Sequence, residues 1–112
     1  MKIVRSTGVA EVGVSHNGEI KKKVLLEKGA IPQLMNFSSA VFKPGQFVKT
    51  HNHPTMYEVF YILKGRAEFV VNEEKVLLGK GDCITIAPGE WHSQSNPYEE
   101  NVEWVYFGIA TD

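Results

Sequence analysis

Short segments of β-forming residues, separated by turn residues, run along the whole chain, and this pattern restricts the fold most. The segments are rich in Val, Ile, Phe, Tyr and Trp, which pack well on pleated surfaces. No stretch of ten or more residues has the period of an amphipathic helix. Many short strands at this spacing indicate an antiparallel sandwich or a closed barrel. We therefore expect an all-β protein with strands at 8–14, 22–28, 34–42, 46–53, 57–63, 66–72, 75–79, 82–87, 91–95 and 102–110.

The residues between these segments favour tight turns. Pro44-Gly45 and Pro88-Gly89 suit the two central positions of a type II turn, because proline presets the first φ and glycine accepts a positive second one. The segment 71–76 is typical of a hairpin connection. The run 59–63 is apolar on both faces, so we expect the core to cover one face and another sheet or subunit to cover the other.

The length and charge of the chain exclude several classes of protein. With 112 residues, the sequence predicts one domain. The formal net charge of -1 gives no electrostatic reason to expect nucleic acid, and the only basic run, 21–23, is typical of a solvated strand entrance. A single cysteine excludes an internal disulfide, and no segment reads as a signal peptide or a membrane span. We expect a cytoplasmic protein.

Three of the four histidines and one glutamate form a candidate metal site. His51 and His53 are two residues apart in a predicted strand and therefore project to the same face. Glu58 opens the next strand after a turn that Pro54 favours, and His92 follows the Pro88-Gly89 turn. Imidazoles and a carboxylate on adjacent strands make a ligand set for a first-row transition metal.

Each of these side chains also has an ordinary structural interpretation. A lone histidine in a strand, such as His92, is more often hydrogen-bonded or exposed than a metal ligand. The group of His51, His53 and Glu58 is harder to explain without an ion, because burying an ionised carboxylate with no partner costs several kcal/mol or more. His16, beside Asn17-Gly18, is predicted to be a surface turn residue.

Two motifs resemble those of the cupin superfamily. The first has the form G-x5-H-x-H-x(3,4)-E-x6-G and is matched here without departure. The second, G-x5-P-x-G-x2-H-x3-N, is matched except that proline stands directly before the second glycine, which alters the local turn. The fifteen residues between the motifs, 66–80, are similar to those of short single-domain microbial cupins of the cupin 2 type. The matching residues are Gly45, His51, His53, Glu58 and Gly65 in the first motif (45–65), and Gly81, Gly89, His92 and Asn96 in the second (81–96).

The resemblance implies a double-stranded β-helix, or jelly-roll barrel, formed as one cupin domain by residues 1–112. It implies one divalent transition metal on His51, His53, Glu58 and His92, with iron or manganese favoured and zinc, nickel or copper as alternatives. Four protein ligands on an octahedral ion leave two positions for a bidentate substrate or dioxygen. Many small cupins are homodimers, so we expect a homodimer whose interface includes the N-terminal strands, with 59–63 and the aromatic-rich tail 102–109 as further candidates.

Strand alternation predicts which side chains surround the metal. Six residues are candidates for substrate binding because each shares the face of a predicted ligand: Phe47, Lys49, Phe60, Ile62, Gln94 and Asn96. Lys49 could bind an anion, or lie in solvent at its strand start. The two amides could bond to a metal-bound ligand, or satisfy backbone groups instead.

The other large or reactive side chains are assigned to structural positions. Cys83 is predicted to be a small core residue. Trp91 and Trp104 are expected in the core or at a subunit interface. Tyr57 and Tyr61 alternate with Glu58 and should point away from it.

Three kinds of function fit these observations. The first is a metal-dependent enzyme acting on a small organic molecule, foremost an oxygenase, with isomerase, decarboxylase or lyase chemistry as the next version. The second is a non-catalytic module that binds or senses a small molecule. The third is a barrel that keeps the motif for stability alone. No nucleophile elbow, phosphate-binding loop or dinucleotide fingerprint is present.

Overall fold

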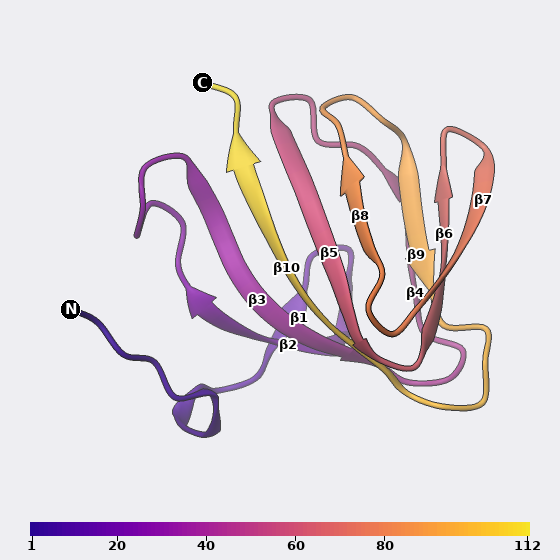
Figure 1. Ribbon diagram of the computed structural model, residues 1–112, viewed down its shortest axis with the longest axis horizontal. Helices are drawn as coiled ribbons and strands as arrows, with labels where there is room; N and C mark the ends of the chain where they lie inside the picture. Colours follow the sequence, from indigo (N-terminus) through magenta and orange to yellow (C-terminus); the bar gives the residue numbers. More distant parts are fainter.

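The computed structural model describes residues 1–112 and consists of strands and one short 3-10 turn (Figure 1). The elements are η1 (Ser6–Gly8), β1 (Val12–Val14), β2 (Asn17–Leu26), β3 (Leu34–Phe42), β4 (Phe47–His51), β5 (Met56–Lys64), β6 (Arg66–Val71), β7 (Glu74–Gly79), β8 (Cys83–Ile86), β9 (His92–Ser95) and β10 (Val102–Ala110).

The strands form two antiparallel sheets that face each other. The six-stranded sheet has the order β1-β2-β3-β10-β5-β8, and the four-stranded sheet has the order β4-β9-β6-β7. In Figure 1 the chain crosses between the two sheets several times, so strands close in sequence, such as β4 and β5, belong to opposite sheets. This arrangement confirms the predicted all-β jelly-roll fold.

The predicted strands are found, and the largest difference lies at the N-terminus. The range 34–42 is reproduced without change in β3, as is 102–110 in β10. The predicted strand 8–14 is too long, because only Val12–Val14 forms a strand that pairs with β2. Strand β2 begins at Asn17, five residues before the predicted start, since Ser15 and His16 form a tight turn in which His16 has a φ of 74°.

The core lies between the sheets and is rich in aromatic side chains. Trp104 packs against Phe42, Phe60 and Phe69 with ring centroids 4.5, 5.7 and 5.8 Å apart, respectively. All four are at most 2% exposed. Trp104 therefore lies in the core, one of the two positions predicted for it. Burial of large aromatic surfaces contributes about 25 cal/mol per Å².

The predicted turn glycines adopt the backbone that their sequence indicates. Gly45 and Gly89 have φ values of 84° and 80°, as the second central position of a type II turn requires. Gly65 is more restricted, because its φ is 83° and a Cβ there would collide with the carbonyl oxygen of Asn101. Only glycine fits this turn without strain.

The outer face of the six-stranded sheet is partly apolar and open to solvent. Val59 is half-buried, whereas Tyr61 and Leu63 are 42% and 46% exposed. The core covers the inner face of the run 59–63, but no other part of the chain covers its outer face. Cys83 lies on the same outer face, and the prediction that it is a core residue is wrong: β8 is an edge strand, and its inward positions belong to Ile84 and Ile86.

The structure contains no helix that is both long and apolar enough to cross a membrane.

Candidate metal centre

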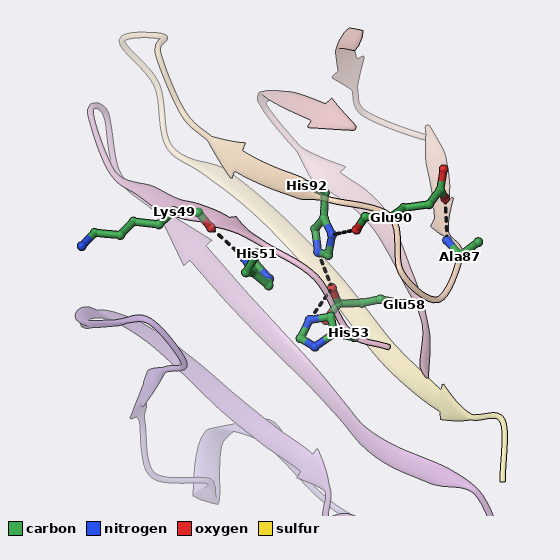
Figure 2. A network of polar contacts seen from close by, with 7 residues as sticks. All are labelled: Lys49, His51, His53, Glu58, Ala87, Glu90 and His92. Carbon is green, nitrogen blue, oxygen red and sulfur yellow. Dashed lines mark hydrogen bonds and ion pairs between the residues drawn. The ribbon is translucent and has the colours of Figure 1, made fainter. Parts of the chain in front are cut away.

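Four side chains from three segments converge at one end of the space between the sheets (Figure 2). His51 ends β4, His53 lies in the loop that follows, Glu58 belongs to β5 and His92 starts β9. One ligand atom from each residue lies within 4.8 Å of the others. The structure thus brings together the four predicted ligands, although β4 ends before His53 because the chain turns at Pro54.

Backbone carbonyls orient two of the imidazoles. His51 Nδ1 lies 2.7 Å from the Lys49 carbonyl oxygen, and His92 Nδ1 lies 3.0 Å from the Glu90 carbonyl oxygen. Because a carbonyl can only accept a hydrogen bond, each Nδ1 carries the proton and each Nε2 is left with a lone pair in the neutral ring. Such outer hydrogen bonds are how proteins fix the tautomer of metal-binding histidines.

Glu58 lies at the centre of the group. Its Oε1 is 3.2 Å from His92 Nε2 and 3.5 Å from His53 Nε2. Burial acts to raise the pKa of Glu58, but the hydrogen bonds and charges of His53 and His92 outweigh it and lower the pKa to about 2. Glu58 is therefore an anion at neutral pH.

The pKa values of His92 and His51 shift in opposite directions. Burial acts to lower the pKa of His92, but its bonds to Glu58 and to the Glu90 carbonyl raise it overall. Burial lowers the pKa of His51, helped by the neighbouring histidines and opposed by the Lys49 carbonyl. His92 Nε2 faces a carboxylate and so needs a cation between them, either a proton or a metal ion.

The donor set fits a divalent transition metal. Two ligands on opposite sides of an ion, each about 2.1 Å away, lie about 4.2 Å apart. The observed spread of 4.8 Å needs only a small contraction. His51, His53, Glu58 and His92 would hold the ion through imidazole nitrogens and a carboxylate oxygen, a set that suits iron, manganese, zinc, nickel or copper.

A β-bulge in β4 changes which residues face the site. Val48 pairs with Gln94 and His51 pairs with His92, so β4 has one more residue than β9 between these two pairs. Val48 therefore points inward beside His51, and the prediction that Phe47 and Lys49 share the face of His51 is wrong. Phe47 is 54% exposed, and the Lys49 side chain extends away from the histidines in Figure 2.

The other four predicted substrate residues differ in their surroundings. Phe60 and Gln94 line the cavity together with three of the four ligands, His51, His53 and Glu58. Ile62 is fully buried in the core and does not line the cavity. Asn96 is 1% exposed and bonds to the backbone, since its Nδ2 donates to the carbonyls of Phe42 and Glu100. Asn96 therefore satisfies backbone groups, which was the structural alternative for this residue.

The loop before β9 contains a positioning residue that sequence reasoning missed. The Glu90 carboxylate accepts hydrogen bonds from the Ala87 N–H at 2.7 Å and from Asn72 Nδ2 at 3.1 Å. Its carbonyl oxygen bonds to His92 (Figure 2). Glu90 thus fixes the Pro88-Gly89 turn that delivers His92. Its position two residues before the predicted ligand His92 could have identified it as a residue that orients this histidine.

The metal group opens on a cavity of ≈ 110 Å³ between the sheets. Its lining includes His16, which is an exposed turn residue as predicted, the half-buried Lys22, and the buried phenol of Tyr106. Burial and the Glu58 charge, opposed by a hydrogen bond to Ser38, raise the pKa of Tyr106 to about 12. The lining residues are Val14, Ser15, His16, Lys22, Asn36, Ala40, Phe42, Val48, His51, His53, Glu58, Phe60, Gln94, Trp104 and Tyr106.

Two buried polar atoms on residues that line this cavity have no hydrogen-bond partner. They are Gln94 Oε1 and Trp104 Nε1. Most buried polar groups in proteins are paired, and an unpaired group costs about 1–3 kcal/mol. A cavity with unpaired polar groups beside a cluster of metal ligands is suited to a small polar molecule.

The remaining large side chains lie outside the cavity. Tyr57 and Tyr61 point away from Glu58, as predicted, and are 45% and 42% exposed. Trp91 is 55% exposed, so it does not lie in the core of the chain.

Comparison with known proteins identifies a family. The family model described as "Cupin domain" matches residues 38–108, well over half of the chain. The match begins in β3 and ends in β10, so it includes all four candidate metal ligands.

Individual relatives agree with this match. The chain is 30% identical over 108 residues to the "Oxalate-binding protein" of Thermotoga maritima, covering 92% of this chain and 89% of the relative. A crystal structure of a predicted oxalate decarboxylase from Thermotoga maritima has a TM-score of 0.89 and 29% identity, covering 97% of this chain and 99% of that one. The polyketide cyclase RemF from Streptomyces resistomycificus, at 21% identity, shares the fold with a TM-score of 0.81 and covers 100% of this chain and 80% of its own.

Proposed function

Because the chain belongs to the cupin domain family, we propose that it is a metal-dependent cupin that binds a small chelating organic acid. In this proposal His51, His53, Glu58 and His92 hold one divalent transition metal, with iron or manganese favoured. The observation that carries the proposal is the convergence of four ligand atoms within 4.8 Å beside a cavity with unpaired polar groups. When bound, the metal supplies a Lewis acid with two coordination positions for the acid.

The size and charge of the cavity support a small anion. A volume of ≈ 110 Å³ suits a molecule of a few heavy atoms better than a sugar or a polyketide. Glu58 is the only acidic residue in the lining, and as a metal ligand its charge is more than offset by the divalent ion. The relative named as an oxalate-binding protein supports the same class of ligand.

Calorimetry tests this function directly. Protein treated with a chelator and then loaded with manganese is titrated with oxalate, and the titration is repeated without metal. We expect saturable binding only in the presence of the metal. Equal binding with and without metal, or no binding in either case, would refute the proposal.

Catalysis at the same site is the second candidate, with oxygenase chemistry as its first version and decarboxylase or isomerase chemistry as the next. The specific observation in its favour is the Tyr106 phenol, which lines the cavity and has a pKa raised to about 12. It therefore keeps its proton at neutral pH and could donate a hydrogen bond to a bound substrate.

Oxygen uptake separates the enzyme from the binding module. The iron- or manganese-loaded protein is incubated in air with catechols, thiols and 2-oxo acids, and carbon dioxide release from oxalate is followed in parallel. An oxygenase consumes oxygen with one of these substrates, and His53→Ala abolishes the uptake. A binding or sensing module leaves every compound unchanged while still binding it.

We also propose that residues 1–112 form a single cupin domain that assembles as a homodimer through the outer face of the six-stranded sheet. Tyr57, Tyr61 and Leu63 on β5 are each more than 40% exposed there, and apolar side chains on an open face favour a protein partner. Light scattering should give twice the mass of the chain, and Leu63→Glu should give the mass of one chain. A cytoplasmic location and the lack of a nucleic-acid partner stay predictions from the sequence.

A further inference from the structure

The β1–β2 hairpin lies outside the segment matched by the family model, yet four of its residues line the cavity: Val14, Ser15, His16 and Lys22. We infer that Lys22 and His16 of this hairpin bind the carboxylate oxygens that face away from the metal, so that the site prefers a dicarboxylate to a monocarboxylate. The inference rests on the proposed function, since it assigns the ligand class of the same metal centre.

Lys22 differs from its two lysine neighbours in direction and in partners. Lys22 pairs with Ala40, which is buried, and its side chain lines the cavity. The ammonium groups of Lys21 and Lys23 bond to the carbonyl oxygens of Gly18 and Ser6 at 2.9 and 2.8 Å. The ammonium group of Lys22 has no hydrogen bond or ion pair with any residue of the chain.

Lys22 is half-buried and pairs with the buried Ala40, and its ammonium group has no partner from the chain that would compete with a ligand. The one acidic residue of the cavity lining is Glu58, whose carboxylate already contacts His53 and His92. The positive charge of Lys22 is therefore available to a ligand that enters the cavity.

His16 places a second donor on the same side. Its ring lies 4.5 Å from the ring of His51, centroid to centroid, and it lines the cavity. Its φ of 74° lies in the left-handed region, which histidine adopts more readily than most residues other than glycine. The turn at Ser15-His16 thus holds an imidazole next to a metal ligand while leaving it exposed to solvent.

The chemistry of chelation explains why these two residues favour a dicarboxylate. When a two-carbon dicarboxylate binds a metal through one oxygen of each carboxylate, two negatively charged oxygens stay free. A 2-oxo monocarboxylate that chelates through its keto and carboxylate oxygens leaves only one. Charge-assisted hydrogen bonds are about twice as strong as neutral ones, so Lys22 and His16 contribute more to the dianion.

The test compares oxalate and pyruvate binding to manganese-loaded protein by calorimetry. We expect Lys22→Met to weaken oxalate binding by about tenfold or more and pyruvate binding by about threefold or less, so that the ratio of the two affinities falls. Lys22→Arg should restore most of the ratio. Lys21→Met is the matched control, because it removes a neighbouring lysine that points away from the cavity, and it should leave both affinities unchanged.

A second variant tests His16. His16→Asn keeps a residue that tolerates the left-handed backbone but removes the ring, and it should weaken oxalate binding several-fold without changing manganese affinity. If wild-type protein binds neither acid, the proposed function itself fails, and this inference fails with it. If wild-type protein binds oxalate but Lys22→Met behaves like Lys21→Met, or loses both acids in equal proportion, the inference alone is overturned.

Discussion

The two sides of the cavity are built in opposite ways. On the metal side, backbone carbonyls hold His51 and His92, and Glu58 contacts His53 and His92. On the hairpin side, the Lys22 ammonium has no partner in the chain. Elsewhere in the lining, Gln94 on β9 and Trp104 on β10 each keep one buried polar atom unpaired.

This difference indicates a division of tasks. Side chains that bind an ion must be held at fixed distances. A hydrogen bond to the ring nitrogen that does not face the ion fixes the orientation of a histidine. Side chains that bind an exchangeable molecule need free donors and acceptors until that molecule arrives. Changes on the metal side should therefore alter metal affinity, and changes on the hairpin side should alter ligand selectivity while the metal stays bound.

The largest effect is expected from Glu58→Gln. The change keeps the size of the side chain but removes the only anion among the four candidate ligands. Manganese affinity should fall by more than the roughly 10–100-fold that is typical for loss of an outer-shell partner, as measured by competition with a fluorescent chelator. His16→Asn is the control on the opposite side. Equal metal affinity in Glu58→Gln and wild type would show that Glu58 is not a metal ligand, and the metal side of the cavity would lose its assigned task.

The second effect concerns the metal-free protein in acid. The pKa of Glu58 is about 2 in the fold, against an ordinary value of 4.5. Because the pKa is lower in the folded state, the ionised Glu58 adds to the free energy of unfolding. This contribution is fully present well above pH 4.5 and is lost as the pH falls towards 2, since the unfolded chain takes up the proton first. A difference of about 2.5 pKa units corresponds to about 3 kcal/mol.

Urea unfolding in the presence of a chelator, between pH 6 and pH 2.5, measures this loss. Glu58→Gln cannot titrate, so the difference in unfolding free energy between wild type and variant should shrink as the pH falls. A difference that stays constant over this range would show that the histidines do not stabilise the carboxylate.

A smaller effect is expected from Glu90→Ala. This variant removes the carboxylate that bonds to Ala87 and Asn72 but keeps the carbonyl that bonds to His92. The loop should loosen, and manganese affinity should fall by about tenfold. Glu99→Ala, at an exposed position whose side chain makes no hydrogen bond or ion pair with the chain, is the matched control. Manganese affinity of both variants is measured by the same chelator competition. If Glu90→Ala binds manganese as tightly as Glu99→Ala, Glu90 has no positioning role.

The smallest effect is expected from Lys49→Ala. Only the backbone carbonyl of Lys49 contacts the site, and its side chain points away from the histidines (Figure 2). Affinities for manganese and oxalate should stay within about twofold of wild type, as for most exposed substitutions. A clear loss of oxalate affinity would show that the anion binds on the β4 side instead of beside Lys22.

The fold and the metal ligands could be predicted because both depend on local patterns. The spacing of His51, His53 and Glu58 and the turn before His92 are properties of neighbouring residues. The strand boundaries of β3 and β10 follow from apolar runs between turn residues.

The surroundings of the metal could not be predicted in the same way. One extra residue in β4 reverses the faces of Phe47 and Lys49, and bulges leave no clear mark in a single sequence. His16 belongs to the β1–β2 hairpin, which is distant in sequence from the metal ligands. It lines the cavity because the fold brings this hairpin next to His51. The edge position of β8, which exposes Cys83, depends on the order of strands in the whole sheet.

Anomalous diffraction from crystals loaded with one equivalent of manganese tests the central claim most directly. The account predicts one strong peak per chain, with the Nε2 atoms of His51, His53 and His92 and a carboxylate oxygen of Glu58 all about 2.0–2.3 Å from it. A peak elsewhere, or no peak while His92 Nε2 stays bonded to Glu58 Oε1, would contradict it.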